Sequence, residues 1–219
     1  GKCMRIEWLN KNSTDRVVVF FNGWGMDSNA VRHLTGDYDI LMINDYRQLN
    51  TEVLPELTLY REVNIVAWSM GVWAAANILP EWGVFCTRLI ALNGTEHPVN
   101  DSWGIPDKIY RLTERGMNAA GREKFMLRML ADAEERKRFA VDKPQRELEE
   151  VCEELTAIRL QSETRQNTLT WDKVYVSSGD VIFSQTNQRA WWDNRARKIV
   201  VLDGGHYPFY HFESWEEIL

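Results

Sequence analysis

The sequence is poor in cysteine and contains no long apolar run. Its three cysteines, Cys3, Cys86 and Cys152, are widely spaced and form no CxxC pair, so we expect reduced structural thiols rather than disulfides or metal ligands. No stretch is apolar for long enough to span a membrane. The first residues lead into a strand-like segment without the core of a signal peptide, and we interpret Gly1 as a cloning remnant. These absences predict a cytoplasmic protein with no bound metal.

Basic residues are fewer than acidic ones. The chain has 26 lysine and arginine residues and 32 aspartate and glutamate residues, and its net charge is -6. An acidic chain argues against nucleic acid as the main partner. A length of 219 residues suits one sizeable α/β domain with a small insertion, and not two independent domains. We therefore expect one domain over residues 1–219 that acts as a monomer and binds neither nucleic acid nor membrane.

Short β-branched runs recur along the chain and predict its architecture. They alternate with helical segments, which is typical of a mostly parallel central sheet with helices on both faces. In such a sheet the functional residues gather where the strands end. The predicted strands are 16–21, 38–43, 63–66, 87–92, 173–177 and 198–202, with an edge strand at 6–9.

The alternation stops between residues 102 and 170. This stretch contains helical patterns, such as 122–130 and 147–155, and no strand-like run. A helical stretch of this length exceeds a single crossover connection, although ordinary crossover helices remain the alternative. We therefore predict a helical cap, inserted at 102–170, that covers the crevice at the strand ends.

The segment Ala67-Trp68-Ser69-Met70-Gly71 joins a predicted strand to a helix-forming run. A serine at such a sharp corner is forced into a strained backbone, which raises its hydroxyl above the sheet and points the next amide at a bound carbonyl oxygen. This arrangement is the nucleophile elbow of the α/β-hydrolase fold, whose usual pattern is G-x-S-x-G. Ala67 departs from the pattern but is still small. We predict Ser69 as the nucleophile, and a serine in an ordinary turn is the alternative.

A serine nucleophile needs a base, and the base needs an acid that orients it. His206 follows the last predicted strand in Asp203-Gly204-Gly205-His206, and Asp180 ends the preceding strand. The order serine, aspartate, histidine along the chain is that of α/β-hydrolases. We predict Asp180 as the acid, with Asp203 as its competitor. The other histidines are expected to be structural or exposed: His33 in a surface helix, His97 before a proline, and His211 beyond the turn.

The oxyanion pocket of such an enzyme requires preorganised N–H donors. The loop Phe21-Asn22-Gly23-Trp24-Gly25-Met26-Asp27 places a glycine on each side of Trp24. These glycines let the backbone bend until the Trp24 amide converges with that of Met70, although they also suit an ordinary turn. The Trp24 indole is also a candidate to cover the acyl side of the pocket.

Three segments resemble those of the BioG-type pimeloyl-acyl-carrier-protein methyl ester esterases. They are Phe21 to Asp27, Ala67 to Trp73, and Asp180 to Phe183 with Asn187-Gln188. The resemblance runs from about Val17 to the C-terminus. It implies a small capped α/β-hydrolase of biotin synthesis that cleaves a methyl ester from pimeloyl carried on acyl carrier protein. It also implies an acyl-enzyme intermediate and no metal or organic cofactor.

The predicted cap is basic inside an acidic protein. From Lys108 to Arg138 there are nine basic residues and five acidic ones. Acyl carrier proteins are acidic, so such a surface would steer a carrier-bound substrate, and an ordinary solvated helix face is the equal alternative. In the same stretch, Phe125 stands at helical spacing with Met126, Met129 and Leu130 and belongs either to the core or to the substrate-binding wall.

Two other functions use the same features. A broader small-ester carboxylesterase or a thioesterase would need the same triad, and a comparison of free with carrier-bound esters would distinguish it. A non-enzymatic binding protein on a hydrolase scaffold is the second rival. Labelling by a serine-directed fluorophosphonate would decide that case.

Overall fold

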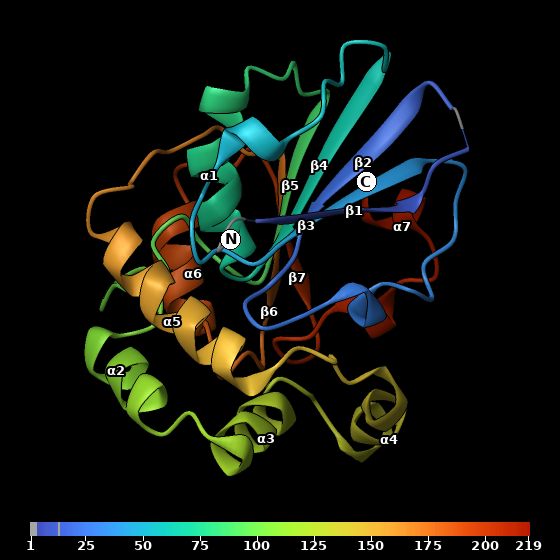
Figure 1. Cartoon of the computed structure of the whole chain (residues 1–219). Helices are drawn as coiled ribbons and strands as arrows, with labels where there is room; N and C mark the ends of the chain where they lie inside the picture. The colour runs from blue at the N-terminus through green and yellow to red at the C-terminus, as the bar shows by residue number, and fades with distance from the viewer. Residues whose placement is uncertain (1–3, 13) are drawn as a thin grey trace.

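The computed structural model describes residues 4–12 and 14–219, which form a seven-stranded sheet flanked by helices (Figure 1). The strand order is β1-β3-β2-β4-β5-β6-β7, and every neighbouring pair is parallel except β1 with β3. All the predicted strands are present, and the predicted edge strand is β1. Gly1 and Cys3 lie outside the described residues. The strands are Arg5–Asn10 (β1), Arg16–Phe21 (β2), Asp39–Asn44 (β3), Glu62–Trp68 (β4), Arg88–Leu92 (β5), Lys173–Ser177 (β6) and Ile199–Leu202 (β7).

The central strands of the sheet are buried on both faces, because their alternate side chains enter two separate cores. In β2, Val17, Val19 and Phe21 belong to one core, whereas Val18 and Phe20 belong to the other. This explains why the strands are continuous apolar runs and do not alternate with polar residues. The first core is covered by α1 (Gly71–Trp82) and α6 (Gln185–Trp192).

The second face is covered by short elements in place of long helices. We expected a surface helix at His33, and this prediction is wrong: the chain forms one 3-10 turn and then an irregular turn that contains His33. The Nε2 of His33 lies 2.8 Å from the carbonyl oxygen of Phe209 and 3.1 Å from that of Phe212. These contacts bend the segment toward the C-terminal region, so a helix does not continue. The covering elements include η1 (Ser28–Ala30), η3 (Phe209–His211) and α7 (Trp215–Ile218), together with Met126 and Phe139 from two helices of the stretch between β5 and β6.

Four helices lie between β5 and β6, in the stretch predicted as a cap. Figure 1 shows them below and to the left of the sheet. They pack on one another and on the sheet; the Tyr110 hydroxyl, for example, donates to the carbonyl oxygen of Leu155 at 2.6 Å. No helix in the described part of the chain is both long and apolar enough to cross a membrane. The four helices are α2 (Asp107–Arg115), α3 (Ala119–Arg128), α4 (Ala133–Asp142) and α5 (Leu148–Ser162).

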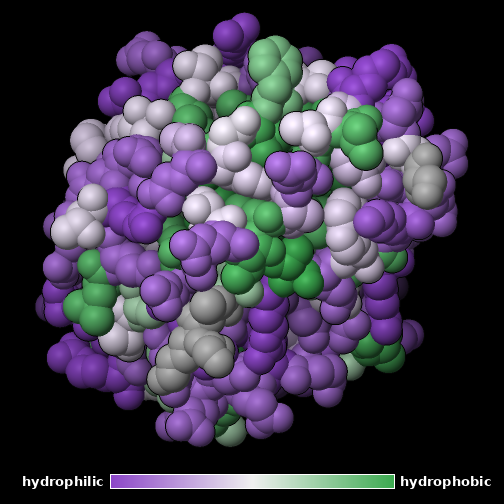
Figure 2. All heavy atoms as spheres, turned by 45° about the horizontal axis from the view of Figure 1, so that its top comes forward, coloured by the Kyte–Doolittle hydropathy of each residue, from purple (hydrophilic) through white to green (hydrophobic). Residues whose placement is uncertain are grey.

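The end of the molecule where β4 and β5 begin is mostly hydrophilic, with an apolar area near its middle (Figure 2). Leu59 and Phe85, in the loops that precede these two strands, are 95% and 91% exposed. The predicted site residues lie elsewhere, because they all follow the carboxyl ends of parallel strands or belong to the helices beside them.

Candidate active site

Ser69 lies at the corner between β4 and α1 in a left-handed conformation, with φ at 59°. This conformation is strained for a residue other than glycine. A Cβ atom at Gly71 would lie 2.3 Å from the Phe21 carbonyl oxygen, and one at Gly94 would lie 2.2 Å from the Ser69 carbonyl oxygen. Only glycine fits at these two positions, whereas the fully buried Ala67 is accommodated in β4. The departure from G-x-S-x-G therefore leaves the corner intact.

The structure brings Ser69, His206 and Asp180 together. The Nε2 of His206 lies 2.9 Å from Ser69 Oγ, and its Nδ1 lies 2.8 Å from Asp180 Oδ2. The other carboxylate oxygen of Asp180 accepts from the amides of Ile182 and Phe183, at 2.8 and 2.9 Å. Because a carboxylate only accepts, His206 must carry its proton on Nδ1, which leaves Nε2 free to accept from the serine hydroxyl. The arrangement is suited to proton transfer from serine to histidine.

The competing residues lie apart from this arrangement. Asp203 is exposed, and the carboxylate bonded to the imidazole is that of Asp180. His211 is exposed as well, and His97 is half-buried, where burial lowers its pKa with a smaller contribution from Arg195. Among the described residues, no group of three or more side chains is placed to hold a metal ion.

The supporting roles of two residues were missed at the level of sequence, although one of them, Gln188, lies in a segment that carries the family resemblance. Asn93 follows β5 with φ at 47°, and its Nδ2 donates to the His206 carbonyl oxygen at 3.0 Å and to Ser177 Oγ at 2.9 Å. Gln188 donates to Asp180 Oδ2 at 3.2 Å. The asparagine-glycine pair after β5 was a turn signal that could have marked the first of them. These contacts hold the backbone of the histidine and the carboxylate of the aspartate.

The two predicted oxyanion donors are the amides of Trp24 and Met70. Neither amide donates a hydrogen bond to another group in the described chain, although the amides on both sides of Trp24 do. The Gly23 amide donates to the side chain of the preceding asparagine at 2.9 Å, and the Gly25 amide donates to Glu154 Oε1 at 3.1 Å. Both predicted donors are therefore available for a substrate oxygen, and their convergence on it remains a prediction.

Phe125 lies beside the serine corner, whereas the Trp24 indole is held by helix α5. The Trp24 Nε1 donates to the Val151 carbonyl oxygen at 2.7 Å, and its ring packs edge-on against Phe125 at 5.0 Å. A cavity of about 30 Å³ is lined by Phe125 with Met70 and Ile182, and not by the indole. Phe125 is thus the better placed of the two aromatic residues for a substrate contact.

A larger groove of about 780 Å³ follows the outer face of α3 and borders the loops that carry Asp180 and His206. Arg128 and Val181 line both the groove and the small cavity. They also meet directly, because Arg128 Nη2 donates to the Val181 carbonyl oxygen at 3.3 Å. The groove therefore reaches the edge of the serine site.

A family model described as pimeloyl-ACP methyl esterase BioG matches residues 4–218. The malonyl-[acyl-carrier protein] O-methyltransferase of Bacteroides fragilis (strain 638R) is 38% identical over 192 residues, and the chain spans 39% of the length of that relative and 87% of its own. The crystal structure of BioG from Haemophilus influenzae matches with a TM-score of 0.90 at 31% identity, over 98% of this chain and 99% of that one. A lipase-esterase related protein from Clostridium acetobutylicum, 10% identical over 94% of this chain and 93% of that one, shares the fold with a TM-score of 0.66.

Proposed function

The chain belongs to the BioG family of pimeloyl-ACP methyl esterases, and we propose that it hydrolyses the methyl ester of a pimeloyl group carried on acyl carrier protein. Ser69 is the nucleophile, His206 is the general base, and Asp180 orients the imidazole. The observation that carries this proposal is the pair of hydrogen bonds at His206, 2.9 Å to Ser69 Oγ and 2.8 Å to Asp180 Oδ2. Helices α2 to α5 form the cap over this site.

In the first half-reaction, Ser69 Oγ attacks the ester carbonyl carbon while its proton passes to His206 Nε2. The carbonyl oxygen becomes an oxyanion and accepts hydrogen bonds from the Trp24 and Met70 amides. When the tetrahedral intermediate collapses, the bond to the methoxy oxygen breaks and the proton on Nε2 passes to that oxygen. Methanol leaves, and the acyl group remains on the serine.

In the second half-reaction, a water molecule attacks the acyl-enzyme carbonyl and gives a proton to His206 Nε2. The bond to Ser69 Oγ then breaks, and the proton returns to that oxygen. The product is a free carboxyl group at the far end of the acyl chain, while the thioester to the carrier stays intact. The reaction requires no metal or organic cofactor.

The Bacteroides fragilis relative supports a carrier-bound methyl ester as the substrate. Its name describes transfer of a methyl group to malonyl on acyl carrier protein, which places a methyl ester on a carrier-bound diacid. Removal of a methyl ester from a carrier-bound diacid is the reverse change at the same functional group. A chain similar to part of that protein is therefore well matched to such a substrate.

Mass spectrometry of the carrier after incubation with its pimeloyl methyl ester tests the proposal. Ester hydrolysis removes one CH₂ unit from the adduct and releases methanol, whereas a thioesterase would remove the whole acyl group and leave a free thiol on the carrier. Turnover of small free methyl esters with no preference for the carrier-bound one would indicate the broader carboxylesterase. No turnover together with no labelling by a fluorophosphonate would indicate a binding protein.

We propose that the groove along α3 receives the acidic carrier. Lys124, Arg128 and Arg136 are exposed on its wall. The lining contains two acidic residues, Glu123 and Asp203, and Glu123 is paired with Lys143 at 2.8 Å. The groove is therefore positive on balance, and a positive surface attracts an acidic partner from a distance.

Other basic residues of the cap are less suitable for docking, because tertiary contacts already engage them. Arg122 Nη1 donates to the Arg146 carbonyl oxygen at 2.8 Å. The guanidinium of Arg138 lies over the Tyr210 ring at 3.9 Å. Changing these residues would disturb packing as well as charge.

Reversing Lys124 and Arg136 to glutamate is expected to lower kcat/KM for the carrier-bound ester about tenfold at low salt, because rim charges act mainly through the rate of encounter. A small free ester should be unaffected. Added salt should reduce the difference, since screening at 0.15 M has a length of about 8 Å. Kinetics with both substrates against ionic strength make the measurement.

The matched control reverses Lys108 and Arg115, which are exposed on α2 and lie outside the lining of the groove. It should leave both substrates near wild type. Equal losses on both substrates in the groove variant would indicate a damaged cap, and no loss on either would make the basic residues an ordinary solvated face.

A further inference from the structure

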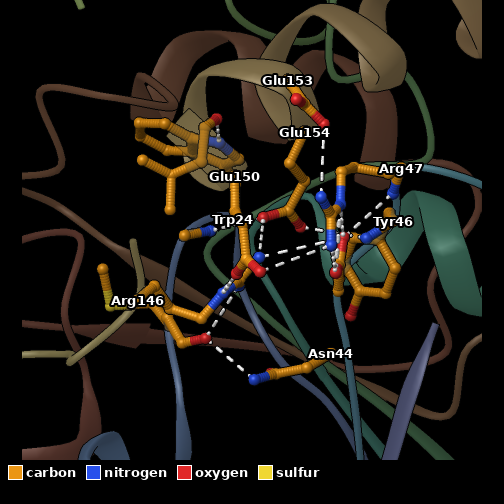
Figure 3. A network of polar contacts seen from close by, with 12 residues as sticks. Trp24, Asn44, Tyr46, Arg47, Arg146, Glu150, Glu153 and Glu154 are labelled. Atoms are coloured by element: carbon orange, nitrogen blue, oxygen red, sulfur yellow. Dashed lines mark hydrogen bonds and ion pairs between the residues drawn. The ribbon is translucent and has the colours of Figure 1, made fainter. Parts of the chain in front are cut away.

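A network of buried charges joins helix α5 to the loops that follow β2 and β3 (Figure 3). At its centre, Arg146 and Glu154 form an ion pair of 3.0 Å, with side chains that are 3% and 0% exposed. Water cannot replace a partner lost at such a depth, so each contact of this pair matters for the groups around it. The charged members are Arg5, which is half-exposed, and Asp45, Arg47, Arg146, Glu150, Glu153 and Glu154.

The carboxylate of Glu154 reaches out of α5 and binds the backbone of both loops. Its Oε1 accepts from the Gly25 amide at 3.1 Å and from Arg146 Nη2 at 3.0 Å, and its Oε2 accepts from the Tyr46 amide at 3.0 Å. Burial raises the pKa of Glu154, and Arg146 and the two amides oppose this rise. All these partners donate, so the geometry suits the ionised carboxylate.

Helix α5 and the segment before it also contact the loop of residues 21–27, which carries the Trp24 amide, at other points. Arg146 Nη1 donates to the Met26 carbonyl oxygen at 3.2 Å, and the Trp24 indole donates to the Val151 carbonyl oxygen at 2.7 Å. Gly25 has φ at 72°, and a Cβ there would already touch the Val151 side chain at 3.6 Å. The loop therefore lies directly against α5.

These contacts restrict the direction of the Trp24 amide. The carbonyl oxygen of Gly23 accepts from the Met26 amide at 3.4 Å, and in a planar trans peptide the Trp24 N–H points away from that carbonyl. The next peptide is oriented by the bond from the Gly25 amide to Glu154. With the peptides on both sides of Trp24 oriented, its N–H has little freedom to turn.

We infer that Glu154 is a positioning residue, which holds the Trp24 amide in the direction needed to bind the oxyanion. The inference rests on the hydrolytic mechanism proposed above. A donor fixed before the reaction stabilises developing charge without the cost of reorienting it. Helix α5 then contributes to the chemical step, in addition to its part in covering the site.

Glu154→Gln tests the inference, because glutamine keeps the shape but turns one acceptor oxygen into an NH₂ group that faces a donor. We expect kcat for a small chromogenic ester to fall about 10- to 100-fold, less than the loss of a whole oxyanion donor, with KM changed less than about threefold. Affinity for an alkyl boronic acid, whose tetrahedral adduct on Ser69 places an oxygen in the oxyanion pocket, should fall by a similar factor. Glu149→Gln, an exposed change on the same helix, should behave as wild type.

A folded Glu154→Gln protein with wild-type kcat and wild-type boronic acid affinity would overturn the inference and leave Glu154 a purely structural residue. If the glutamine variant does not fold by near-UV circular dichroism, Glu154→Asp takes its place, since it keeps the charge but withdraws the carboxylate by one methylene. The same selective loss is expected.

Boronic acid binding tests the role of Glu154 independently of the proposed substrate. A wild type that binds the boronic acid but does not hydrolyse carrier-bound methyl pimeloyl would refute the substrate, and the affinities of the variants would still decide the role of Glu154. A wild type that does not bind the boronic acid would overturn both.

Discussion

Replacing Ser69 with alanine is expected to lower kcat for the carrier-bound methyl ester by about 10⁶-fold while the protein stays folded. The hydroxyl is hydrogen-bonded to His206 Nε2, so the change removes the nucleophile and leaves this nitrogen without that partner. Alanine at a φ of 59° carries the same left-handed strain as serine does. The midpoint of thermal unfolding should therefore move by only about 2–4 °C, the shift that corresponds to about 1 kcal/mol at this chain length.

Methanol release and mass spectrometry of a quenched reaction measure this effect. The wild type should show a mass increase on the peptide that contains Ser69, and the alanine variant should show none. Ser178→Ala, an exposed serine close to Asp180 in the sequence, serves as the control and should retain full activity. Turnover of Ser69→Ala above about a tenth of wild type would contradict a covalent mechanism at this residue.

Asp180→Asn is expected to lower kcat by about 10⁴-fold, through the wrong tautomer of His206. One oxygen of Asp180 accepts from the amides of Ile182 and Phe183, so the carbonyl oxygen of an asparagine would remain there. Its NH₂ group would then face His206 Nδ1 and donate to it. The imidazole proton would move to Nε2, which could no longer accept the proton of Ser69.

Asp203→Asn is the matched control for this prediction, because it makes the same chemical change on the exposed loop beside His206. It should leave kcat near the wild-type value, as measured by the same methanol assay on both variants. If Asp203→Asn proved the more damaging change, the orienting acid would have been assigned to the wrong residue. Near-UV circular dichroism of the Asp180 variant should match the wild type, which would separate lost chemistry from lost structure.

The sequence by itself determined the sheet and was enough to select Ser69, Asp180 and His206 as candidates for the site. Buried strands are β-branched runs, and the corner at Ser69 needs small neighbours, so both leave local signals. Asp180 and His206 each follow a predicted strand, and parallel strands end at the same edge of a sheet. Chain order and strand ends were therefore enough to expect these side chains together, and His206 lies within hydrogen-bond distance of both Ser69 and Asp180. Their catalytic roles are proposals.

Only the tertiary structure decided which polar residues support this site. Glu154 resembles the other acidic residues of its helix, yet its partner Gly25 lies 129 positions away. Asn93 holds the backbone of His206 across 113 positions, and the contacts of His33 with the C-terminal region replace the helix expected there. A hydrogen bond between segments so far apart leaves no periodic pattern in either segment, because periodicity records which face of one element is buried and not what lies against it.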